Sequence, residues 1–271
     1  MSHLLRGHAP ITDEGWKLID EEARERLLPG LAARRLVDFA GPLGWEYSAT
    51  NLGRVQDNDL SEVSGVEAHR RVVLPLLELR ARFSVSREEL QAGDRGAEDV
   101  DFAELDAAAQ RIVESENVAV FHGWPKAGVE GITKSSPHAP ITHKKDFEDY
   151  PNHVAMAVEL LLRNGIAGPY GLALGREDYT RVVESTEHGG YPLLDHLRKI
   201  LEGPIVWSPG ISGAVVLSLR GGDFAFESGQ DISVGYLAHD LDTVTLYLEE
   251  SYSFRVLTPE AAVAIVAPED H

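Results

Sequence analysis

Two adjacent acidic residues, Glu249 and Glu250, are candidates for acid–base chemistry. General acid–base catalysis requires carboxyl groups that reach the same substrate. The segment 243–256 has the composition of a β-strand, however, and adjacent residues of a strand point to opposite faces. The two carboxyls therefore cannot share a site, and we expect both to be solvated residues of an edge strand.

The eleven histidines could bind a metal ion or act as a base. His138 and His143 lie in a proline-rich segment, and His188 and His196 flank a turn. No H-E-x-x-H motif and no i, i+4 histidine pair occurs, so we expect solvated histidines and no metal site. Glu187 could orient His188 as a base, but no nucleophile accompanies the pair.

Other catalytic and cofactor motifs are missing from the sequence. The segment 210–213 contains a serine between glycines but lacks the spacing of a nucleophile elbow. There is no P-loop and no dinucleotide fingerprint. The absence of cysteine excludes disulfides, thiolate metal sites and cysteine nucleophiles. The sequence therefore predicts a protein that is not an enzyme and that binds no cofactor.

The composition limits the partners of the chain. Its 271 residues carry 44 acidic against 25 basic side chains, a formal net charge of −19. Such a chain repels phosphate backbones, so we expect no nucleic-acid binding. No apolar run reaches the ~18–20 residues of a membrane span, and no apolar run follows Arg6 as in a secretory signal. We expect a cytoplasmic protein with no membrane contact.

Helical periodicity is clearest in two segments. Thr12 is expected to cap a helix with apolar residues at three-and-four spacing, which Pro29 and Gly30 end. A longer helix is expected at about 101–120. Further helices are expected at about 147–164, 176–184 and 193–201.

The remaining elements are strand-like. Extended segments at 46–48 and 70–83 flank a polar stretch, 51–66, that has too few apolar side chains to bury itself. These predict a long hairpin projecting toward a partner subunit. Strands are expected at 36–39, 46–48, 170–174, near Val206, and at 214–219, 223–226, 232–236 and 243–256. The fold class is α+β, with helices inserted between two parts of a β-containing body.

An ordered set of short motifs spans nearly the whole chain. It comprises Ala9–Thr12, Arg34–Asp38, Gly41–Tyr47, Pro75–Arg80, Phe121–Gly123, Gly165–Tyr170, His188–Pro192, Arg220–Phe224, Gly229–Tyr236 and Ser253–Phe254. With these motifs the sequence resembles the encapsulin shell proteins, also known by the older name linocin. The resemblance implies a phage-capsid-like fold of the Hong Kong 97 type and self-assembly into a closed icosahedral homo-oligomer of the smallest type.

The resemblance also implies a division of the chain. Residues 1–48, 74–133 and 220–271 would form a peripheral domain that includes the N-terminal helix. Residues 49–73 would form the extended loop, and 134–219 the axial domain.

Encapsulins enclose cargo enzymes, typically peroxidases or ferritin-like iron oxidases, through a C-terminal targeting peptide of the cargo. The matching positions for cargo-peptide binding here are Arg34, Asp38, Phe39, Ile232, Val234, Tyr236 and Phe254. The last four could equally be core strand residues. A five-fold pore loop would comprise Thr186, Glu187, His188, Gly189, Gly190 and Tyr191. Some relatives stack a flavin on a tryptophan, but the matching segment 86–90 has no aromatic residue, so flavin binding is not expected.

Two other classes of protein share features with this chain. A prophage major capsid protein would have a similar fold, but a net charge of −19 opposes DNA packaging. A secreted bacteriocin-type protein or protease would need an export signal or a catalytic set, and the sequence shows neither.

Overall fold

The computed structural model describes residues 3–56, 61–143, 149–186 and 190–268. Its helices are α1 (Asp13–Leu27), α2 (Arg87–Asp94), α3 (Ala103–Phe121), α4 (Ile132–Ser135), α5 (Tyr150–Arg163), α6 (Arg176–Glu184) and α7 (Leu193–Leu201). Its strands are β1 (Asp38–Ala40), β2 (Ala49–Val55), β3 (Arg71–Pro75), β4 (Leu77–Ser86), β5 (Ile141–Thr142), β6 (Tyr170–Leu174), β7 (Ile205–Trp207), β8 (Ala214–Ser218), β9 (Phe224–Ser228), β10 (Ser233–His239), β11 (Thr243–Val256) and β12 (Ala262–Val266). The α+β class is confirmed.

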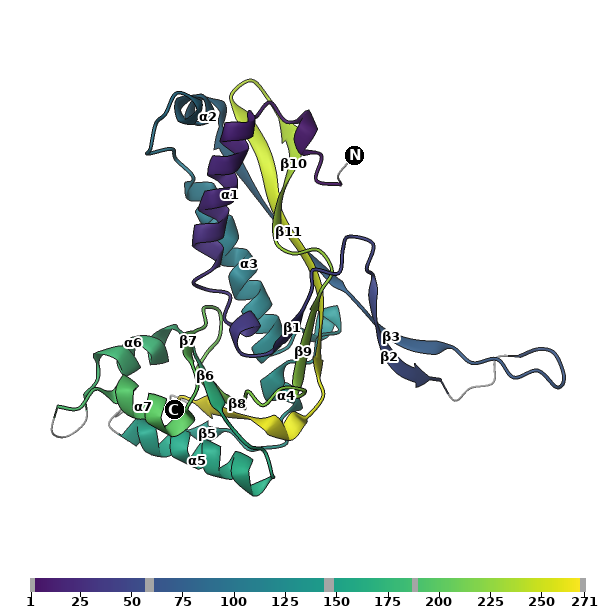
Figure 1. Ribbon diagram of the computed structural model, residues 1–271, viewed down its shortest axis with the longest axis vertical. Coiled ribbons are helices and arrows are strands. Elements are labelled where there is room, and N and C mark those ends of the chain that lie inside the picture. The colour runs from purple at the N-terminus through teal and green to yellow at the C-terminus, as the bar shows by residue number, and fades with distance from the viewer. Residues whose placement is uncertain (1–2, 57–60, 144–148, 187–189, 269–271) are drawn as a thin grey trace.

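One sheet surrounds the long strand β11. The strands run in the order β1, β9, β11 and β10, and β4 also pairs with β11. Helices α3 and α1 lie along this sheet (Figure 1). The predicted apolar stripe explains the packing of α1, because Ile19, Ala23 and Leu27 are buried. The Thr12 cap is also confirmed, since its hydroxyl accepts a hydrogen bond from the Gly15 amide.

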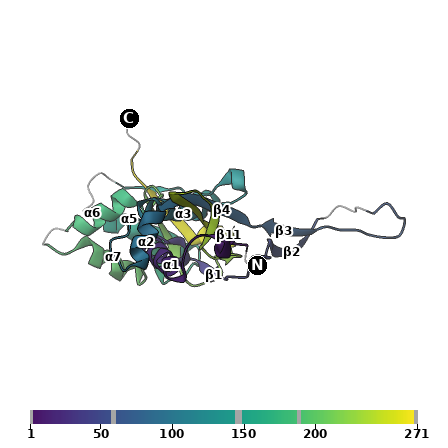
Figure 2. The same cartoon turned by 90° about the horizontal axis from the view of Figure 1, so that it is seen from above.

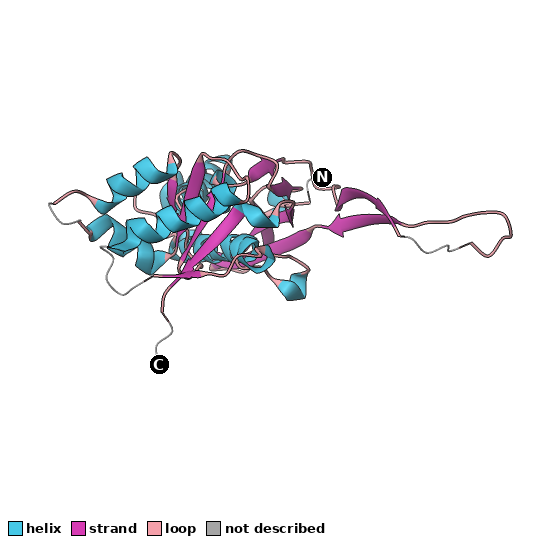
Figure 3. Cartoon of the chain, turned by 90° about the horizontal axis from the view of Figure 1, so that it is seen from below, coloured by secondary structure: helices cyan, strands magenta, loops and turns pink. Residues whose placement is uncertain are grey.

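A second sheet lies at the other end of the body. It has the order β5, β12, β8, β6 and β7, and α5, α6 and α7 pack beside it (Figures 1 and 3). Strands β6 and β8 are buried along their whole lengths, which explains their continuous apolar sequences. Strand β12 joins this sheet although the predicted division assigns 220–271 to the peripheral domain. The division of the chain into a peripheral domain, an extended loop and an axial domain stays a prediction.

Strands β2 and β3 form a separate antiparallel ribbon that projects from the body (Figures 1 and 2). The predicted hairpin is therefore present. The extended segment 70–83 is divided, because its first part pairs with β2 and its second part, β4, pairs with β11. The predicted strand at 46–48 is wrong, because these residues form a turn and an extended link before β2.

Several elements lie outside the sequence prediction. These are the helices α2 and α4 and the strands β2, β5 and β12. No helix among the described residues is long and apolar enough to cross a membrane.

Candidate functional site

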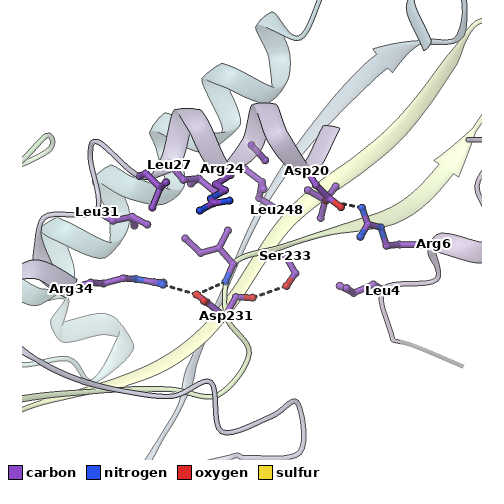
Figure 4. Close-up of a pocket in the computed structure, with 14 residues that line it drawn as sticks. Leu4, Arg6, Asp20, Arg24, Leu27, Leu31, Arg34, Asp231, Ser233 and Leu248 are labelled. Carbon is purple, nitrogen blue, oxygen red and sulfur yellow. Dashed lines mark hydrogen bonds and ion pairs between the residues drawn. The ribbon is translucent and has the colours of Figure 1, made fainter. Parts of the chain in front are cut away.

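An open pocket of about 450 Å³ lies between α1, the segment 231–234 and the N-terminal segment (Figure 4). Its lining residues are Leu4, Arg6, Asp20, Ala23, Arg24, Leu27, Leu28, Leu31, Arg34, Asp231, Ile232, Ser233, Val234 and Leu248. Aliphatic side chains dominate the set, with charged groups at both ends. Such a lining suits an extended peptide with apolar anchor side chains.

The N-terminal segment forms one side of the pocket. The Leu4 carbonyl accepts a hydrogen bond from the Tyr236 amide at 2.9 Å, so the segment is bound to β10. The Arg6 guanidinium pairs with Asp20 of α1 at 2.7 Å and lies 4.0 Å from the Trp16 ring centroid. These contacts hold the first residues of the chain against both neighbouring elements.

Arg34 binds three carboxylates at the opposite end of the pocket. Its Nε lies 2.8 Å from Glu116 of α3, its Nη1 2.5 Å from Asp231, and its Nη2 2.8 Å from Glu250 of β11. Glu116 and Glu250 are fully buried, so the guanidinium compensates charge that has no access to water. Arg34 therefore connects α3, β11 and the pocket.

Burial controls the protonation of this cluster. It raises the pKa of Glu250 well above the ordinary value, and the neighbouring charge of Glu116 raises it further. Burial also raises the pKa of Glu116, although the Arg34 charge opposes the shift. For Arg34, burial would lower the pKa, but the charges of Glu116 and Glu250 outweigh it and raise the pKa.

The structure distributes the predicted cargo-peptide residues over three places. Arg34, Ile232 and Val234 line the pocket, and Tyr236 follows them on β10. The Phe39 ring is 37% exposed, stacks on Phe226, and lies 5.2 Å from the Arg34 guanidinium.

The other two predicted residues lie away from the pocket lining. Asp38 accepts a hydrogen bond from the Gly222 amide at 2.6 Å and belongs to a smaller, neighbouring hollow. Phe254 is only 3% exposed and pairs with Phe226 inside the sheet, so it lies beneath the surface.

Sequence reasoning missed much of the pocket lining. Leu4, Arg6, Leu28 and Leu31 come from the N-terminal segment and from the C-terminal end of α1. Leu28 carried a usable signal: it is a large apolar residue directly after the stripe of α1, and it is 55% exposed. Leu4 and Arg6 carried no such signal, because Leu4 is placed by β10 and Arg6 by its contacts with α1.

Two predictions of solvated side chains are wrong. Glu249 and Glu250 point to opposite faces as expected, but both are buried because β11 is a central strand. Glu249 pairs with Arg80 and with His3, whose Nε2 lies 3.1 Å away. His143 is 4% exposed, with Nε2 3.9 Å from Asp178, because it follows β5, the edge strand of the second sheet, and its amide bonds to Val266 of β12.

The predicted pore loop joins α6 to α7. Thr186 pairs with Pro192 across its base, and Tyr191 is 39% exposed with the Lys199 ammonium 4.9 Å from its ring centroid. Gly190 has a φ of +79°, as expected for a glycine at a tight turn. Glu187, His188 and Gly189 lie outside the described residues, and the pore function of the loop stays a prediction.

Comparison with known proteins gives consistent matches. The Linocin_M18 family model, described as "Encapsulating protein for peroxidase", matches residues 1–253. The type 1 encapsulin shell protein of Rhodospirillum rubrum is 43% identical over 270 residues, covering 98% of this chain and 96% of that protein. The type 1 encapsulin shell protein of Brevibacterium linens is 41% identical over 266 residues, covering 98% and 99%.

Solved structures agree on the fold. A virus-like particle from Pyrococcus furiosus has a TM-score of 0.63 at 19% identity, covering 93% of this chain and 99% of that chain. A structure of Mycobacterium phage Bobi has a TM-score of 0.56 at 13% identity, covering 89% and 91%. The predicted phage-capsid-like fold of the Hong Kong 97 type is confirmed. The chain belongs to the Linocin_M18 family of encapsulating proteins, whose matched relatives are type 1 encapsulin shell proteins.

Proposed function

We propose that copies of this chain assemble into a closed icosahedral shell that encloses a cargo enzyme and has no catalytic role of its own. Two features support assembly: the whole-length similarity to encapsulin shell proteins and the projecting β2–β3 ribbon. A ribbon with so little buried side-chain surface gains stability from a neighbouring copy. The smallest closed shell, on the order of sixty subunits, needs only one repeated set of interfaces.

The cargo enters through a C-terminal targeting peptide that binds the pocket beside α1. The observation that carries this proposal is the aliphatic lining, in which Leu28 is exposed and Ile232 half-buried between charged groups. Apolar side chains of a peptide would displace water from these residues, while Arg34 and Asp231 fix its register. Phe39 extends the same surface. Phe254 contributes by lying beside Phe226 on the neighbouring strand.

The family description favours a peroxidase as cargo. A ferritin-like cargo is the second candidate, because one relative, from Pyrococcus furiosus, is a ferritin-like–encapsulin shell fusion protein. Assembly and loading would take place in the cytoplasm, where the cargo is synthesised.

The test is co-expression with a fluorescent protein that carries the C-terminal tail of a peroxidase. Leu28→Asp replaces an apolar lining residue by a charge, and we expect captured fluorescence per shell to fall about tenfold or more, since losing an anchor costs roughly 2 kcal/mol. Leu241→Asp is the matched control, because Leu241 is 87% exposed and lies outside the pocket. Equal capture by all three proteins would refute the pocket assignment.

A further inference from the structure

The projecting ribbon is attached to the body through a small polar network at its root. Glu227 of β9 lies at the centre of this network, with its side chain 18% exposed. The Tyr47 hydroxyl donates to Glu227 Oε2 at 2.6 Å, and the Thr50 hydroxyl donates to the same oxygen at 2.7 Å. Arg255 of β11 donates to Oε1 at 3.0 Å. One carboxylate thus joins the ribbon to two strands of the sheet.

The hydrogen positions in this network follow from counting the donors and acceptors of each hydroxyl group. Thr50 has one hydroxyl proton, and it is donated to Glu227, so the Ser253 hydroxyl must donate in the 2.6 Å contact with Thr50. The Tyr47, Thr50 and Arg255 donors therefore all point toward the Glu227 carboxylate, and Ser253 donates to the Thr50 oxygen. Burial acts to raise the pKa of Glu227, but the hydrogen bonds from Tyr47 and Thr50, together with the charge and hydrogen bond of Arg255, outweigh it and lower the pKa. The network requires an ionised acid at this position.

The network is the buried joint of the ribbon. Among the described residues of β2 and β3, Thr50 alone is buried, at 2% exposed, and the others are exposed or half-buried. Main-chain hydrogen bonds from Leu43 to Ser228 and from Gly44 to Gly229 fix the chain just before the joint. Beyond Thr50 no described residue of the ribbon is held by a comparable set of contacts. A small rotation at the joint would therefore move the far end of the ribbon by a large distance (Figures 1 and 2).

We propose that the Glu227 carboxylate is a positioning residue for assembly: it sets the direction in which the ribbon leaves the body, and so the angle at which neighbouring copies meet. This inference rests on the proposed shell assembly. A closed shell forms only when each interface repeats at one fixed angle. Loosening the joint should therefore change closure and particle size more than it changes the stability of the subunit.

The test separates the joint from the body. The double variant Tyr47→Phe with Thr50→Val keeps side-chain shape but removes both hydrogen bonds from the root of the ribbon to Glu227, while the Glu227–Arg255 pair remains within the sheet. The control is Asp223→Asn, which weakens another partly buried carboxylate–arginine pair, with Arg220, outside the joint. The double variant also removes the acceptor of the buried Ser253 hydroxyl, so Ser253→Ala is measured beside it as a second control. Particle size is measured by light scattering and electron microscopy, and subunit stability by thermal unfolding.

We expect the double variant to lose about tenfold or more of the closed particles, because a hydrogen bond to a charged group is worth roughly that factor. Its unfolding midpoint should stay close to that of Asp223→Asn, which should form normal particles. Glu227→Gln should reproduce the defect, because its amide NH₂ would face donors. Wild-type particles from the double variant, or an equal defect in Asp223→Asn, would overturn the inference. If the wild-type protein forms no particles, the assembly function fails and the inference with it.

Discussion

Removing the guanidinium of Arg34 should strongly destabilise the subunit. Arg34→Met preserves much of the side-chain volume but leaves Glu116 and Glu250 without their shared cation. Both carboxyls are buried, and they approach Arg34 at 2.8 Å each. Breaking a buried ion pair from one side costs about 3–5 kcal/mol, because the remaining charge has neither partner nor water. For a chain of this size that corresponds to a drop in the unfolding midpoint of roughly 6–20 °C.

The pH dependence of this variant has a definite sign. Burial already raises the pKa of Glu116 and Glu250 in the folded protein, and removing Arg34 raises both further. The folded variant then binds more protons than the unfolded chain, so its stability is greatest in acid and falls as the pH rises. The loss is up to about 1.4 kcal/mol per pH unit for each proton involved. The deficit should therefore be larger at pH about 8 than at pH about 5.5.

Thermal unfolding followed by circular dichroism at both pH values tests this reasoning. The matched control is Arg26→Met, because Arg26 also pairs with two carboxylates but is 54% exposed, so its loss should cost less than about 1 kcal/mol. Adding Glu250→Gln to Arg34→Met should restore part of the midpoint by removing one buried acid. Equal midpoints for the Arg34 and Arg26 variants, or a deficit that grows in acid, would refute the account of the cluster.

Three further outcomes are expected. Burial lowers the pKa of His122 in the folded protein, so the unfolded chain binds the proton at a higher pH than the folded protein does. The folded protein therefore loses stability as the pH falls below about 6.5. The unfolding midpoint of His122→Gln should depend less on pH in that range than the wild-type midpoint, and an unchanged dependence would contradict this. Ile19→Ala truncates a fully buried side chain and should cost about 2–5 kcal/mol in chemical denaturation, whereas Leu28→Ala should cost little. Deleting 56–64, which lie between β2 and β3 in the sequence, should leave a folded subunit that forms no closed particles by light scattering. Uniform particles would show that this segment is dispensable.

Local patterns predicted the elements whose packing depends on one face. The spacing of Ile19, Ala23 and Leu27 identified α1, and a hydroxyl before two acids identified its cap. Most strands of the last third were found because runs of β-branched and aromatic residues alternate there with glycines. In contrast, β12 was missed because its assignment depends on pairing with β8, a partner far away in the sequence. The helices α2 and α4 are too short to show a clear period.

The candidate site was predicted only in part, because its residues come together through contacts between segments far apart in the sequence. The alternation of side chains along a strand placed Glu249 and Glu250 on opposite faces. It could not show that β11 lies between β4 and β10, where both glutamates are buried. Arg34 meets partners 82 and 216 residues away, so no local pattern could reveal its charge cluster. The family resemblance predicted that Arg34 contributes to the cargo-peptide site. Only the structure shows that its partners Glu116 and Glu250 are buried.

Electron microscopy of the purified wild-type protein tests the central claim most directly. A subunit with this fold and a projecting ribbon should form hollow particles of one uniform diameter without any added partner. Monomers, small oligomers or open sheets at the same protein concentration would contradict the proposal that this chain builds a closed shell.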